Sequence, residues 1–288
     1  MWTLFDLLIG LATSVFLFFA NWGDEPPTAG HVATATYTTA ARVDQKNDLD
    51  IYRSGNDSVP ASKQSLNPVL FFIHGGGLMI GDKNNHKQLG HKFASLGYTT
   101  VLVNHRLSPE VSHPDHIEDI ATAFAWVQKH IAEYGGDPSR VFVAGHSSGG
   151  YLGMLLATNS KYLAKHQFSP EHIRGVVAIS GFFHIERLAE ERPKSVWSEQ
   201  SERWPDASPA NHLEPGLPPT LLLYAEHDND ARKLESIDLG KKIEALGTTP
   251  VDVHQIADRN HATIGMYMMT KEDMASTHLL DFMGRNVQ

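Results

Sequence analysis

The sequence predicts an α/β protein built on a mostly parallel sheet with helices on both faces. Short, wholly apolar runs recur along the chain, as at 69–73 and 141–144, and such runs are typical of strands buried on both faces. Segments with helical spacing of apolar residues separate these runs, which is the alternation expected of parallel strands joined by crossover helices. Functional residues in such sheets gather at the carboxyl ends of the strands, so the site is expected in the loops that follow the strands.

Length and composition limit the function before any motif is considered. A chain of 288 residues, 41% of them hydrophobic, suits one large domain with a sizeable core. The chain has no cysteine, which excludes a disulfide framework, a thiolate metal site and a cysteine nucleophile. Its net charge of −9 would repel phosphate backbones, so no nucleic-acid partner is expected.

The predicted elements alternate along the chain. Two short strands at 33–38 and 48–53 come first, and each later buried strand leads into a segment with helical character. The clearest helix runs from Ile117 to Tyr134, where apolar residues are three or four positions apart and two glycines follow. The remaining strands are expected at 69–73, 98–103, 141–144, 176–180, 221–225 and 251–256, and the remaining helices at 84–96, from about 151, at 231–246 and at 270–284.

The first 22 residues differ in character from the rest of the chain. Residues 7–22 carry no charge and include four large aromatic side chains, so a helix here would have no polar face. We therefore expect residues 1–22 to be an export signal or an uncleaved anchor, with membrane association through residues 2–22. The expected location is exported (periplasmic or extracellular) or membrane-anchored, and a core helix is the alternative interpretation.

Ser147 lies at the centre of a Gly-x-Ser-x-Gly sequence that connects an apolar strand to an apolar helix. A sharp turn at this point strains the backbone of the serine, and the glycines on either side prevent clashes. The turn exposes the Ser147 hydroxyl and directs N–H groups of the helix start toward whatever binds there. This context favours Ser147 as a nucleophile over a mere packing turn. Ser148 lacks the symmetric glycines two residues to either side and is expected to supply only its N–H.

Three consecutive glycines after His74 form the second feature with chemical meaning. The strand 69–73 ends in His74-Gly75-Gly76-Gly77, and side chains are absent just where backbone amides could approach a developing oxyanion. We predict an oxyanion hole made by the N–H groups of Gly76, Gly77 and Ser148. His74 is expected to brace this loop by hydrogen bonding.

A serine nucleophile needs a base, and the base needs an acid that orients it. Asp228 follows the strand 221–225 and His261 follows the strand 251–256, in the order acid and then histidine. We predict Asp228 as the acid and His261 as the base. Glu226 and Asp230 are the competing acids, but Glu226 lies close to the strand end and Asp230 is typical of a helix cap.

The chain from 68 to about 264 resembles the α/β-hydrolase fold, and more narrowly the esterases and lipases related to hormone-sensitive lipase together with a kynurenine formamidase-like and feruloyl esterase-like branch. The resemblance rests on the segments 74–77, 104–110, 134–140 and 145–150, with Ser208-Pro209, Asp228 and His261 in addition. It implies a Ser147–Asp228–His261 triad and a catalytic domain over residues 23–288. His146 and Ser148 differ from the residues that usually flank the serine in the hormone-sensitive-lipase group. The segment 104–106 also differs from the form that is usual in that group. These departures favour the second branch.

Residues 182–206 are predicted to be a small lid insertion, as is common after the sixth core strand of this fold. Its aromatic residues could line an acyl or aryl pocket, or they could form a small core of their own. The candidate substrate contacts are Leu78, His146, Phe182 and Trp197. No metal-ligand spacing and no phosphate-binding glycine loop stand out, so neither a metal nor a cofactor is expected.

The predicted activity is a serine hydrolase that cleaves carboxylic esters with short or medium acyl chains through an acyl-enzyme. The expected partner is therefore a small-molecule ester. An arylformamidase or a feruloyl-type esterase would use the same machinery. A non-catalytic member of the fold that only binds a ligand is the alternative from another class.

Overall fold

The computed structural model describes residues 30–38, 46–54, 65–188, 196–270 and 273–287. Their centre is an eight-stranded sheet with the order β1-β2-β4-β3-β5-β6-β7-β8. β1 and β2 pair antiparallel with each other, β2 pairs antiparallel with β4, and every other pair is parallel. The strands are β1 (Gly30–Thr36), β2 (Asp48–Arg53), β3 (Asn67–Ile73), β4 (Thr99–Val103), β5 (Gly136–His146), β6 (Gly175–Ile179), β7 (Thr220–Ala225) and β8 (Val251–Ile256).

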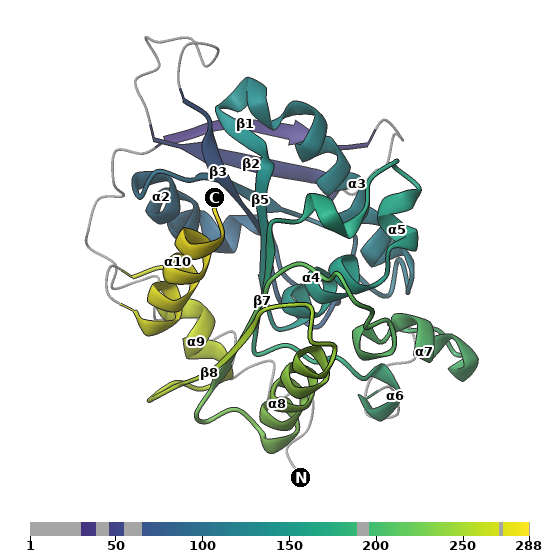
Figure 1. Cartoon of the computed structure of the whole chain (residues 1–288). Coiled ribbons are helices and arrows are strands. Elements are labelled where there is room, and N and C mark those ends of the chain that lie inside the picture. The colour runs from purple at the N-terminus through teal and green to yellow at the C-terminus, as the bar shows by residue number, and fades with distance from the viewer. Residues whose placement is uncertain (1–29, 39–45, 55–64, 189–195, 271–272, 288) are drawn as a thin grey trace.

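Helices cover both faces of this sheet (Figure 1). In the figure, α2 and α10 lie on one side, and α3, α4 and α5 lie on the other. The α-helices are α2 (Lys87–Ser95), α3 (Asp115–His130), α4 (Ser148–Thr158), α5 (Lys161–Ala164), α6 (Ile185–Leu188), α7 (Trp204–Ala207), α8 (Asp230–Ala245), α9 (His261–Tyr267) and α10 (Met274–Asn286).

The apolar strand runs are explained by the two hydrophobic cores. Along β3, Val69, Phe71 and Ile73 enter the core that contains α3, α4 and α8. The alternate residues Leu70 and Phe72 enter the second core, which contains α2, α9 and α10. A strand whose two faces are both buried has no position for polar side chains, so it reads as a continuous apolar run.

The predicted fold class is confirmed, and the predicted boundaries differ in three instructive places. β5 begins at Gly136 rather than 141, and the prediction missed this part because residues 137–140 are partly buried or exposed and lack the apolar signature. α4 begins at Ser148 rather than about 151, although Ser-Gly-Gly is a poor helix-forming sequence. The short helix α9, His261–Tyr267, was not predicted; the Asn260 side chain caps it by accepting the N–H groups of Ala262 and Thr263.

The predicted export or anchor segment, residues 1–22, lies outside the described residues, and the predicted lid at 182–206 is described only outside 189–195. None of the described helices has the length and apolar character needed to cross a membrane.

Candidate active site

Ser147 occupies the strained turn between β5 and α4. Its φ of 56° and ψ of −119° are unusual for a residue with a side chain, and its N–H donates to the carbonyl of Ile179 on β6 at 2.8 Å. The turn needs glycine two residues on, because a Cβ at Gly149 would lie 2.1 Å from the carbonyl oxygen of Ile73. The close approach of α4 to the end of β3 therefore explains the glycine, and it brings the nucleophile candidate to the loop that begins at His74.

His261 stands between Ser147 and Asp228 at the start of α9. Its Nε2 lies 3.0 Å from Ser147 Oγ, and its Nδ1 lies 3.0 Å from Asp228 Oδ1. Both distances are within hydrogen-bonding range, and the imidazole side chain is one-third exposed, so a substrate can reach it. The three residues come from the ends of β5, β7 and β8, which meet at one edge of the sheet.

Asp228 is fully buried and held by three hydrogen bonds. Besides His261, Ser180 Oγ donates to Asp228 Oδ2 at 2.5 Å, and the Ala225 N–H donates to the same oxygen at 2.9 Å. Burial alone would raise the pKa of Asp228, but the hydrogen bonds from His261, Ser180 and Ala225 outweigh it and hold the pKa at about 2. Asp228 therefore carries its negative charge at neutral pH.

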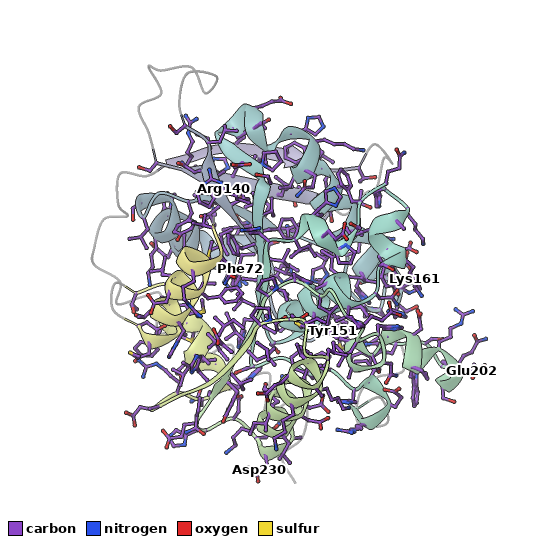
Figure 2. All side chains as sticks on the ribbon, viewed as in Figure 1. Phe72, Arg140, Tyr151, Lys161, Glu202 and Asp230 are labelled. Carbon is purple, nitrogen blue, oxygen red and sulfur yellow. The ribbon has the colours of Figure 1, made fainter. Side chains whose placement is uncertain are left out.

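The two competing acids lie elsewhere. Asp230 is 93% exposed and pairs with Lys233, and its place at the periphery of the molecule is visible in Figure 2. Glu226 accepts the N–H of Asp258 at 2.9 Å. Neither carboxylate contacts His261 in the described contacts, so Asp228 is the acid that the structure brings to the histidine.

Ser180 was missed by the sequence reasoning. It follows directly after β6, with a φ of 49°, and its carbonyl accepts a hydrogen bond from Arg232 at 2.8 Å. The sequence contained only a weak signal for a role of Ser180 in the site, because Ser180 is a single hydroxyl-bearing residue at a strand end on the same sheet edge as Ser147.

The predicted oxyanion loop lies beside Ser147. Gly76 and Gly77 have φ values of 127° and 66°, a region that glycine adopts without strain. The Gly77 N–H donates to Ser148 Oγ at 3.0 Å, so it would have to exchange this hydroxyl for a substrate oxygen in order to act on an oxyanion. Ser148 is the first residue of α4, and its N–H is among those that a helix start leaves without an intrahelical acceptor. The Ser148 side chain thus has a bracing function in addition to the predicted one.

Three buried imidazoles pack behind this loop. His74 stacks on His105 at 4.6 Å between ring centroids, and His105 meets His116 edge-on at 6.1 Å. The Nδ1–H of His74 donates to the carbonyl of Gly75 at 2.8 Å, which is the predicted bracing contact. His74 Nε2, His105 Nε2 and His116 Nδ1 have no hydrogen-bond partner among the described residues. Burial lowers the pKa of each of the three to about 3, so all are neutral at physiological pH.

The candidate substrate contacts lie deeper than predicted. Phe182 and Trp197 are each 1% exposed, and both pack against Tyr151, with ring centroids 4.9 and 6.4 Å from it. Tyr151 lies among tightly packed side chains near the centre of Figure 2. Phe182, Phe183 and Trp197 of the insertion therefore belong to the main hydrophobic core beside α4, and they form neither a pocket wall nor a separate small core.

Leu78 is buried, whereas His146 is partly exposed. Leu78 is 1% exposed, and its carbonyl accepts the N–H of Ser108 at 2.8 Å. The ring of His146 lies 4.8 Å from the ring of His261, and its Nε2 contacts the backbone carbonyl of that residue. His146 therefore supports the candidate base from behind.

Among the described residues, one cluster contains side chains of the kinds that bind metals, and the sequence did not suggest it. Ligand atoms of Glu226, His227 and Asp258 lie within 4.8 Å of one another, on the two loops that also carry Asp228 and His261. His227 and Asp258 are exposed, and exposed acidic groups gather in this way in many proteins without an ion. The grouping alone assigns no metal.

A parallel sheet with helices on both faces, a strained serine between strand and helix, and an acid and a histidine from the next strands define an α/β-hydrolase. The chain belongs to the BD-FAE family, whose model matches residues 49–243. The probable carboxylic ester hydrolase LipM of Mycobacterium tuberculosis is 28% identical over an alignment of 236 positions that covers 75% of this chain and 53% of that protein. Esterase LipQ of the same organism is 25% identical over 83% of this chain and 59% of its own length. This chain thus spans little more than half the length of these relatives.

Solved structures show the same fold. An inhibited esterase B from Lactobacillus rhamnosis aligns with a TM-score of 0.76 at 19% identity, covering 96% of this chain and 93% of its own. Thermogutta terrifontis esterase 2, phosphonylated by cyclosarin, aligns with a TM-score of 0.70 at 21% identity, over 91% and 94% of the two chains.

Proposed function

We propose that this protein is a serine carboxylesterase that hydrolyses carboxylic esters through an acyl-enzyme. The observation that carries the proposal is the position of His261, whose two ring nitrogens are each 3.0 Å from a partner, Ser147 Oγ on one side and Asp228 Oδ1 on the other. A general base must be within hydrogen-bonding reach of the proton it takes, and this arrangement meets that requirement before any substrate binds.

The mechanism follows from the geometry. His261 Nε2 takes the proton of Ser147 as the hydroxyl oxygen attacks the ester carbonyl, and the ionised Asp228 stabilises the imidazolium that forms. Backbone N–H groups of Gly76, Gly77 and Ser148 would stabilise the oxyanion of the tetrahedral intermediate, where one such donor is typically worth ~3 kcal/mol of barrier. The imidazolium then protonates the departing alcohol, and a water molecule activated by the same histidine releases the acid.

The names of the relatives support an ester substrate. LipM, LipN and LipQ are all described as esterases or carboxylic ester hydrolases. We propose acyl chains of short or medium length for this protein, because Phe182 and Trp197, which could have lined an acyl or aryl pocket, are instead buried in the core. An assembled triad is also unnecessary for a protein that only binds a ligand, which speaks against the non-catalytic alternative.

The test is hydrolysis of p-nitrophenyl esters graded from acetate to palmitate. The purified protein should release nitrophenol fastest from the short esters, and Ser147→Ala should abolish release. Ser160→Ala is the matched control, since Ser160 is an exposed serine beside α5. An inactive wild type, or an active Ser147→Ala variant, would refute the proposal. Parallel assays with N-formylkynurenine and methyl ferulate separate an esterase from an arylformamidase and from a feruloyl-type enzyme.

We further propose that residues 1–22 act as an export signal or an anchor, supported by the uncharged run at 7–22. The intact mass of the mature chain and fractionation of the expressing cells test this proposal. A full-length chain in the soluble cytoplasmic fraction would contradict it.

A further inference from the structure

His146 precedes the candidate nucleophile and is the last residue of β5. Its Nε2 lies 2.8 Å from the backbone carbonyl oxygen of His261. Since a carbonyl only accepts, the ring nitrogen must donate, which requires the tautomer with the proton on Nε2. The side chain next to the nucleophile therefore bonds the main chain of the candidate base.

The ring of His146 is confined from two further sides. A Cβ at Gly265 on α9 would lie 3.1–3.3 Å from three atoms of the ring, and a Cβ at Gly75 would lie 3.2 Å from its Nδ1. Both positions carry glycine, so the imidazole occupies a slot between the oxyanion loop and α9. A ring packed this closely cannot turn without displacing one of the two backbones.

The ring also stays uncharged beside a residue that becomes charged. Burial, and after it the neighbouring His261, lower the pKa of His146 well below the ordinary histidine value. His146 therefore remains a neutral donor when His261 takes the serine proton. A second positive charge at this place would oppose the protonation of His261.

We propose that His146 is a positioning residue that fixes His261 against Ser147 through the hydrogen bond to the His261 carbonyl. The adjacent residues His146 and Ser147 at the end of β5 then have linked roles. Ser147 is the nucleophile, and His146 sets the distance between the Ser147 hydroxyl and the His261 imidazole. Asp228 orients the imidazole from one side, and His146 holds the main chain that bears it. The inference rests on the proposed function, because it concerns the same serine and histidine.

The test compares His146→Leu, which keeps most of the volume and loses the donor, with His146→Gln, whose side-chain amide places an N–H near the former Nε2. Displacement of a catalytic group by about 1 Å can lower rates ~100-fold. On a short nitrophenyl ester, we expect kcat of His146→Leu to fall roughly 10- to 100-fold with KM changed less than about threefold. His146→Gln should keep its kcat within roughly threefold of the wild type, clearly above that of His146→Leu. Labelling of Ser147 by a fluorophosphonate should slow in parallel in His146→Leu.

Several results separate this inference from the proposed function. If the wild type neither turns over esters nor reacts with the fluorophosphonate, the proposed function fails. If the wild type is active and His146→Leu keeps its kcat within twofold, or His146→Gln is as impaired as His146→Leu, only the positioning role fails. Nitrogen-15 spectra of the wild-type histidines give a measurement that needs no folded Leu variant, with the His146 signals assigned by their loss in His146→Gln. A neutral ring protonated on Nε2 is expected, and protonation on Nδ1 would overturn the inference.

Discussion

The three imidazoles of His74, His105 and His116 should make the protein sensitive to mild acid. In the folded chain each takes a proton only near a pKa of about 3, whereas the ordinary value is 6.5. The nitrogens that would take the proton, two Nε2 atoms and one Nδ1, are buried without a hydrogen-bond partner among the described residues. A charge there would have no hydrogen-bonding group of the described residues to stabilise it.

The sign and size of the effect follow from linkage. Because the folded pKa lies below the unfolded one, the three groups have no effect well above pH 6.5, and they destabilise the fold progressively between about pH 6.5 and 3. Each group contributes about 1.4 kcal/mol per pH unit within that window, so three give roughly 4 kcal/mol per unit. By pH 4 the loss reaches about 10 kcal/mol, which is comparable with the whole stability of an ordinary domain.

Urea unfolding followed by tryptophan fluorescence between pH 7.5 and 4.5 measures this slope. His105→Phe keeps a ring in the stack and removes one titrating group, so its free energy of unfolding should fall less steeply with pH, by up to about 1.4 kcal/mol per pH unit. His130→Gln is the control for loss of an imidazole outside the stack, since the His130 side chain is 43% exposed on the surface. A free energy of unfolding that stays constant between pH 7 and 5 would refute the reasoning.

Three further changes test the candidate site. Asp228→Asn should lower kcat about 10⁴-fold in a nitrophenyl ester assay, because the base loses the acid that orients it. Asp230→Asn changes a side chain that is 93% exposed and should stay near wild type. The reverse order would assign the acid to Asp230. Ser180→Ala removes one of the hydrogen bonds that lower the pKa of Asp228. The pKa of Asp228 should therefore rise, and kcat should fall roughly tenfold. Unchanged kinetics would exclude a supporting role of Ser180. Gly149→Ala places a Cβ 2.1 Å from the carbonyl oxygen of Ile73 and should lower the free energy of unfolding by about 2–3 kcal/mol, as measured by urea denaturation. An unchanged midpoint of the urea transition would show that α4 can shift to relieve the clash.

The fold and the triad were predictable because both leave a local trace in the sequence. Buried strands read as apolar runs, and the nucleophile turn requires glycines at fixed offsets from Ser147. Asp228 and His261 could be chosen because they follow the strands that come after the nucleophile strand, and the sheet order places β7 and β8 beyond β6.

The missing parts depend on contacts between distant segments. Ser180 has meaning only beside Asp228, 48 positions away, and the bond from Gly77 to Ser148 spans 71 positions. Phe182 and Trp197 could not be assigned to a pocket or to a core from composition, since both environments take aromatic residues. The difference became visible only when both rings were placed against Tyr151.

The place of β8 at the border of the sheet has a consequence for how activity is lost. Among the described strands, β8 pairs with β7 alone, and most of its residues are only half-buried. The chain enters the segment that bears His261 directly from β8. The serine and the glycine loop, in contrast, sit on β5 and β3 in the middle of the sheet. Fraying of β8 would move His261 away from Ser147 while the rest of the molecule kept its fold. Inactivation on warming should therefore precede the melting of the bulk secondary structure, and cooling should restore turnover without a global refolding step.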